Sequence, residues 1–79
     1  MNIYSRLADK SNFSSAENIL VNYILEHSDS IQNYSIRKLS KQSGVSISTI
    51  YRVLEKLEVS GFSELKLQLI NHLDSYLYE

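Results

Sequence analysis

Residues that break regular secondary structure are scarce in this chain, which limits what it can fold into. Among its 79 residues there is no proline, and glycine occurs only at Gly44 and Gly61. Because such residues mark the ends of helices and strands, both glycines are expected at the ends of helices. No stretch alternates apolar and polar residues for long, so no sheet of consequence is expected. The sequence therefore predicts one all-α domain over residues 1–79.

Apolar residues at helical spacing, together with serine caps, predict five helices. Ser14 and Glu17 have the spacing of a capping box at the start of the second helix. Gly44 ends the third helix, where glycine adopts a left-handed conformation without steric cost. The predicted helices cover residues 2–10, 14–27, 36–44, 47–58, and 64 to nearly the end of the chain. The residues expected to face the core are Ile3, Leu7, Ile19, Leu20, Tyr23, Ile24, His27, Ile36, Leu39, Ser43, Ile50, Val53, Leu54, Leu57, Leu65, Leu69, Leu73 and Leu77.

Composition excludes several classes of protein. The chain has no cysteine, which rules out disulfides and thiolate metal sites and fits a reducing compartment. His27 and His72 lie far apart without ligand spacing, and no nucleophile and base are suitably paired. No apolar run approaches the roughly 18 residues that cross a membrane, and the N-terminus lacks the pattern of a signal peptide. We expect a cytoplasmic protein that is not an enzyme and needs no metal, cofactor or membrane.

The segment 36–54 carries the most specific pattern. Two predicted helices are joined by a three-residue turn, residues 44–46. Where the helices cross, bulky side chains would push them apart, and Ser40 and Ser43 supply small ones. Val45 can fill the gap between the helices. These coinciding requirements predict a compact, homeodomain-like domain containing a helix-turn-helix, whose second helix enters the major groove of DNA.

The distribution of charge supports this hypothesis. The net charge is −1, yet the segment from Ile36 to Leu57 contains five cationic residues and only one acidic residue. A local basic patch suffices to attract phosphates, because screening makes near charges count most. The candidate DNA-binding residues are Arg37, Lys38, Lys41, Ser46, Ser48, Thr49, Tyr51, Arg52, Glu55 and Lys56.

Arg52 is the leading candidate for reading bases, since its planar guanidinium matches the O6/N7 edge of guanine. The alternative is a salt bridge to Glu55 on the same helix. For Ser48 we favour DNA contact. For Thr49 and Tyr51, DNA contact and a purely structural role both stay open.

Arg37 and Lys38 occupy the first turn of the third helix, where the helix dipole disfavours positive charge. That local cost is explained if they lie, with Lys41, along the phosphate backbone of DNA. Simple solvation of the three side chains is the alternative.

A further set of residues matches the pattern of a known family: Ser35, Ile36, Leu39, Gly44, Val45, Ser46, Thr49, Arg52, Lys56, Leu57 and the distinctive run from Ser60 to Lys66. On these residues, positions 14–73 resemble the N-terminal domain of RpiR-type bacterial transcriptional regulators. The resemblance implies a five-helix domain that binds operator DNA as a homodimer and controls sugar catabolism. It also implies a C-terminal sugar-isomerase-like domain, missing from this chain, that binds a phosphosugar effector; a natural stand-alone protein is the alternative.

The chain departs from the pattern of that family at three places. A proline frequent after the serine that opens the second helix is absent, and Ile47 stands where another proline is frequent. A glycine common near Glu58 is also missing. The end of the fourth helix is therefore expected to differ in shape.

Two alternatives remain beside this interpretation: a winged-helix DNA binder and a protein-interaction module. A winged helix needs a hairpin after the reading helix, but the following segment has helical periodicity. A protein-interaction module is possible because this fold can serve for docking. Leu67 and Tyr78, apolar residues off the main face, would then mark a partner or dimer surface.

Overall fold

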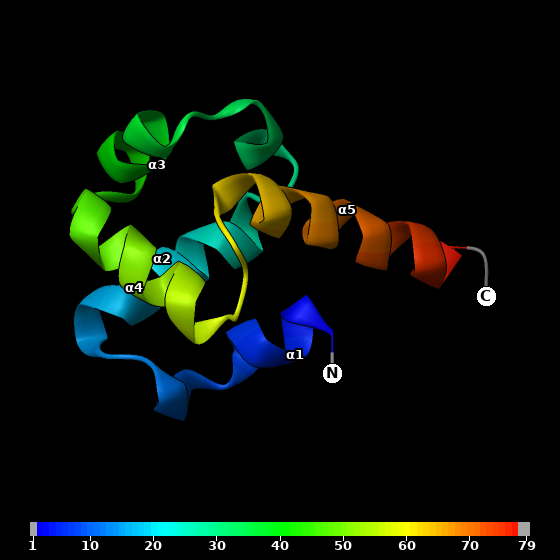
Figure 1. Ribbon diagram of the computed structural model, residues 1–79, viewed down its shortest axis with the longest axis horizontal. Helices are drawn as coiled ribbons and strands as arrows, with labels where there is room; N and C mark the ends of the chain where they lie inside the picture. The colour runs from blue at the N-terminus through cyan, green and yellow to red at the C-terminus, as the bar shows by residue number, and fades with distance from the viewer. Residues whose placement is uncertain (1, 78–79) are drawn as a thin grey trace.

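A computed structural model of the protein describes residues 2–77, and the side chains of residues 2–70. The described residues form five α-helices, which cluster together (Figure 1), and two short 3-10 helices at Lys10–Asn12 and Ser30–Asn33. No strand occurs among the described residues. The predicted all-α, five-helix fold is confirmed. The α-helices are α1 (Ile3–Ala8), α2 (Ser15–Glu26), α3 (Ile36–Ser43), α4 (Ile47–Lys56) and α5 (Phe62–Leu77).

Serine side chains set where the central helices begin. The predicted capping box is confirmed: the Glu17 backbone N–H donates to Ser14 Oγ over 3.2 Å, and the Ser14 N–H donates to Glu17 Oε1 over 3.1 Å. Ser35 and Ser46 cap α3 and α4 through the serine hydroxyl alone, which accepts from the backbone N–H of Lys38 and of Thr49. Each cap satisfies an N–H that the first turn of a helix leaves without a partner. α1 is shorter than predicted, and α5 begins two residues earlier, at Phe62.

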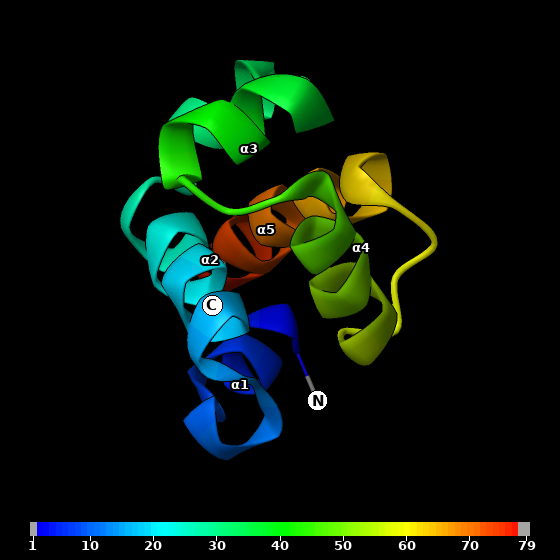
Figure 2. The ribbon, with the colours of Figure 1, turned by 90° about the vertical axis from the view of Figure 1, so that its left-hand side faces the viewer.

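The helices pack so that α3 and α4 lie at one end of the molecule. α4 packs against both α2 and α3, whereas α1 packs against α2 and α5. Figure 1 shows the C-terminal part of α5 extending away from the end that carries α3 and α4. Turned by 90°, Figure 2 presents α3 and α4 with α5 behind them. The helix-turn-helix pair is thus open to solvent on the side away from α5.

The core agrees largely with the predicted faces, with one clear error on α2. Ile19 was expected to face inward but is 55% exposed, while Val21 is fully buried. The buried stripe of α2 runs through Glu17, Leu20, Val21 and Ile24, because α4 packs on the side of Val21 and Glu17. Tyr23, His27, Ile36 and Ser43 are only half-buried. Leu73 and Leu77, with His72 and Tyr78, lie outside the residues whose side chains are described.

In the described part of the chain, no helix is long and apolar enough to cross a membrane. The same residues contain no group of three or more histidine, cysteine or acidic side chains that could hold a metal ion.

Candidate nucleic-acid interface

The turn between α3 and α4 has the conformation that the sequence predicts. Gly44 adopts φ 79° and ψ 13°, and its N–H donates to the carbonyl of Ser40 over 3.0 Å. The Ser40 hydroxyl donates in turn to the Val45 carbonyl over 2.6 Å, and Val45 itself is buried. A small residue at the crossing therefore also fastens the turn, which fixes the direction in which α4 leaves α3.

The first turn of α4 is held by Ser46 and Thr49. Ser46 Oγ accepts from the Thr49 backbone N–H over 3.1 Å, and the two side-chain hydroxyls lie 3.0 Å apart. Thr49 is only 7% exposed, whereas Ser48 is exposed. The structure thus separates two neighbours that sequence analysis grouped: Ser48 points outward, and Thr49 packs inward and stabilises the cap.

The outward side of α4 carries four polar side chains that the sequence predicted as DNA-binding. Tyr51 is 57% exposed, and Ser48, Arg52 and Glu55 are exposed as well. Across the described residues no salt bridge joins Arg52 to Glu55, and no side-chain hydrogen bond holds the Arg52 guanidinium. Arg52 is thus available to a ligand in solvent.

Lys56 differs from the other predicted site residues, because its ammonium group already has protein partners. Lys56 Nζ lies 2.5 Å from Glu17 Oε1 and donates to the Asn12 carbonyl over 3.0 Å. Glu17 is only 3% exposed. The hydrogen bond from Lys56, together with that from the Ser14 backbone, holds the pKa of the Glu17 carboxyl below its usual value. The sequence predicts Glu17 as a capping residue, but nothing along the chain signals its pairing with a lysine 39 positions away.

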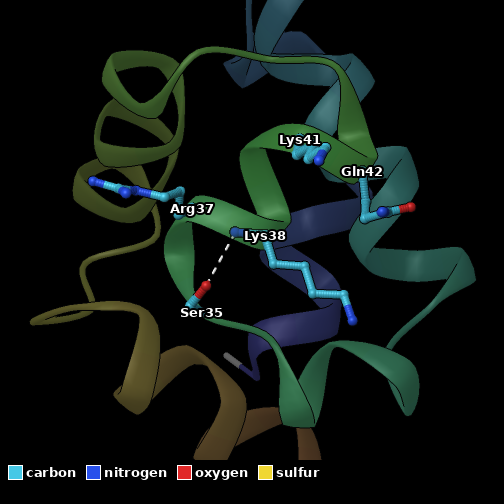
Figure 3. A pocket seen from close by; sticks show the side chains of 5 residues that line it. All are labelled: Ser35, Arg37, Lys38, Lys41 and Gln42. Carbon is cyan, nitrogen blue, oxygen red and sulfur yellow. Dashed lines mark hydrogen bonds between the residues drawn. The ribbon is translucent and has the colours of Figure 1, made fainter.

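Cations line the exposed side of α3. Arg37, Lys38 and Lys41 are all exposed, and they border a shallow hollow of about 330 Å³ (Figure 3). Figure 3 shows Arg37 and Gln42 pointing to opposite sides of the helix. Lys38 Nζ lies 4.8 Å from the centre of the Tyr34 ring, an attractive cation–π distance. Ser35 and Gln42, which the sequence did not predict as DNA-binding residues, complete the lining of the hollow.

A second hollow, of about 470 Å³, connects α3 and α4 with the start of α5. Tyr51 lines it together with the N-terminal turns of α3 and α5. Both hollows include Ser35, so they meet at the start of α3. The two hollows together therefore extend from the cationic residues of α3 to Tyr51 on the outward side of α4. The residues of the second hollow are Tyr34, Ser35, Ile36, Tyr51, Ser60, Gly61, Phe62, Ser63, Glu64 and Lys66.

The end of α4 is fastened by α1. The Arg6 guanidinium donates to the Leu57 carbonyl over 2.6 Å and lies 3.1 Å from the Glu58 carboxylate. Glu58 has φ 60°, the one non-glycine residue with a left-handed backbone in the described part of the chain. It stands near the place where RpiR-type domains commonly have glycine. A glutamate here takes a conformation that glycine adopts at lower cost.

A glycine turn, a serine-capped helix with an outward polar side, and a cationic first helix define the helix-turn-helix class of DNA-binding domains. Residues 1–76 match the family model described as "Helix-turn-helix domain, rpiR family", and the chain belongs to this family. Domains of this family bind DNA in transcription regulation, and such regulators are generally not enzymes. No solved structure matches the chain.

Proposed function

We propose that the domain reads a specific sequence of double-stranded DNA through α4. The observation that carries the proposal is the exposed Arg52, free of side-chain partners and on the same outward side as the exposed Ser48. A guanidinium in that position can donate two hydrogen bonds to a guanine in the major groove. Ser48 lies near the N-terminus of the helix, where hydroxyls and free N–H groups favour phosphates or base edges.

In this proposal the cations of α3 bind the DNA backbone. Arg37, Lys38 and Lys41 are exposed beside the reading helix, and Arg37 and Lys38 lie where the α3 dipole opposes them. Phosphate groups would offset that local cost. Contacts to phosphates set the register of the protein on the duplex but do not read the sequence.

The remaining predicted residues fall into two groups: those exposed toward a ligand, and those whose side chains are already bonded within the protein. Glu55 is exposed on the reading side, where a carboxylate can accept from a cytosine N4 amino group. Tyr51 offers its hydroxyl to a phosphate from the edge of the second hollow. Ser46 and Thr49 support binding by holding the first turn of α4. Lys56, held by Glu17, borders the reading side without joining it.

The wider regulatory role rests on the family alone. The full-length regulator would act as a homodimer, with a phosphosugar effector bound to a sugar-isomerase-like domain, and would control sugar or phosphosugar metabolism. Sedimentation of this chain with a palindromic duplex tests the dimer, since two protomers should bind each duplex. One protomer per palindrome would contradict it.

The sequence-reading proposal is tested by selecting binding sites from random duplexes and comparing two variants on the best site. Arg52→Ala should weaken binding to that site by about 1–3 kcal/mol and relax the preference at one base pair. Lys41→Ala should weaken binding to all sequences about equally, because it contacts only phosphate. If the wild-type chain selects no sequence, or if Arg52→Ala keeps full preference, the assignment of α4 as reader fails. Binding that is indifferent to salt would favour the protein-interaction module instead.

A further inference from the structure

Glu17 is the one buried acidic side chain in the described part of the molecule. Its Oε1 accepts from the Ser14 backbone N–H and from Lys56 Nζ, at 3.1 Å and 2.5 Å. The first contact belongs to the capping box of α2, and a glutamine could supply it equally well. The second contact joins the start of α2 to the end of the reading helix, which capping does not require.

Lys56 follows Arg52 by four residues, so the two side chains leave α4 on the same flank. Arg52 has no side-chain hydrogen bond or salt bridge in the described part of the chain, whereas Lys56 is bonded to Glu17 and to the Asn12 carbonyl. Its ammonium also lies 5.9 Å from the centre of the Phe13 ring. All three partners of Lys56 lie at or before the start of α2.

We propose that Glu17 is a specificity-determining residue that keeps the Lys56 ammonium away from DNA. The inference rests on the proposed reading of DNA by α4. A lysine free to swing toward phosphate would add affinity for every sequence alike, since such contacts carry no sequence information. Held on α2, Lys56 leaves Arg52 as the principal cation on the reading flank, so a larger share of the affinity depends on sequence.

Salt dependence distinguishes this role from a merely structural one. The full chain is titrated onto a fluorescent 20-base-pair duplex of mixed sequence, between 50 and 200 mM salt. Because each extra phosphate contact adds about 0.9 to the slope of log affinity against log salt, Glu17→Gln should steepen that slope by about 0.9. Over this fourfold rise in salt, the fold-decrease in affinity should be about 3.5 times larger for the variant than for the wild type. The glutamine can still accept from Ser14, so the cap is retained.

Three matched variants complete the test. Lys56→Gln should leave the slope unchanged, whereas Lys41→Gln should reduce it by about 0.9. The double variant Glu17→Gln/Lys56→Gln should return to the wild-type slope, which shows that the added charge is that of Lys56. Circular dichroism checks that each variant is helical.

Two results would overturn the inference while leaving the proposed function intact. One is a folded Glu17→Gln variant with the wild-type slope. The other is a Lys56→Gln variant whose slope falls as far as that of Lys41→Gln. This second measurement can be made even if the Glu17→Gln variant does not fold. A wild-type chain without salt-dependent binding would contradict both the inference and the proposed function.

Discussion

At the scale of single residues, two positions take a left-handed backbone, and the chain treats them differently. At position 44 the residue is glycine, which has no Cβ and adopts this conformation without steric cost. A Cβ added there would have no atom within 4 Å. Glu58 adopts φ 60° with a full side chain. The cost of a left-handed backbone for an L-residue is about 1 kcal/mol or more. Glu58 is thus a place where stability can be gained.

Replacing Glu58 by glycine should stabilise the domain. The backbone strain is relieved, and the ion pair to Arg6 that is lost involves a side chain 74% exposed, so it contributes little. We expect the free energy of unfolding to rise by about 0.5–1 kcal/mol, measured by urea denaturation. Gly44→Ala is the matched opposite: with no steric clash present, it should lower the stability by about 1 kcal/mol through strain alone. If both changes shifted the free energy of unfolding in the same direction, this account would be contradicted.

Individual residues also show where sequence reasoning succeeds. The capping box of Ser14 and Glu17 and the left-handed Gly44 were predicted because both depend on residues within a few positions of each other. The exposure of Ile19 was not, since the side of α2 that is buried depends on where α4 packs. The pairing of Lys56 with Glu17 was missed for the same reason. Local chemistry is readable from the sequence, whereas choices made by tertiary packing are not.

At the scale of elements, α4 is fixed at both ends by residues outside it. Ser46 caps its first turn, and Arg6 of α1 donates to the carbonyl of Leu57 just past its last turn. A cation at a helix C-terminus satisfies a free carbonyl and opposes the helix dipole. α1 therefore supports α4 although the two helices lie far apart in the sequence.

Removing the Arg6 cap should loosen the end of α4. Arg6→Met keeps most of the apolar stem but loses a charged hydrogen bond, so we expect a loss of about 1 kcal/mol in unfolding free energy. Hydrogen exchange should also speed up at the Leu57 amide, which donates to the Val53 carbonyl. Glu58→Gln is the control, since it weakens the exposed ion pair but leaves the cap, and it should change neither quantity appreciably. Unchanged exchange at Leu57 in Arg6→Met would show that the cap is dispensable.

Element boundaries show the same limits of prediction. α3 and α4 begin where their serine caps predict, and α3 ends where Gly44 predicts, whereas α4 ends at Lys56, two residues before its predicted end. The 3-10 helix Ser30–Asn33 was not predicted, because its single buried apolar residue, Ile31, gives no periodicity to read. The outward side of α4 was predictable from its buried side, and this gave Ser48, Tyr51, Arg52 and Glu55 as exposed candidates. The second hollow depends on α3, α4 and the start of α5 meeting, so it could not be predicted.

At the scale of the whole molecule, an acidic chain gathers five of its eight lysines and arginines on the two helices of the turn motif. The net charge is −1, yet Arg37, Lys38, Lys41 and Arg52 are exposed on the two helices of the turn motif. Such an arrangement orients the domain toward a polyanion without making it bind every acidic surface strongly. The ion pair between the buried Glu17 and the exposed Lys56 adds a charge interaction that holds α2 to α4, so it affects the stability of the whole domain.

The stability of the whole domain should therefore depend on pH through Glu17. The hydrogen bond from Lys56, then that from the Ser14 backbone and the nearby charge of Arg52, hold the pKa of this carboxyl below its usual 4.5. Between the lowered folded pKa and 4.5, the unfolded chain binds a proton that the folded chain does not, so stability rises with pH there. The contribution of Glu17 is fully present above 4.5 and is lost as pH falls through the folded pKa. Thermal melting from pH 7 downward should show this loss, and Glu17→Gln should be less stable near neutrality but lose less on acidification. A variant that followed the wild-type profile in parallel would mean that the pairing with Lys56 contributes nothing to folding.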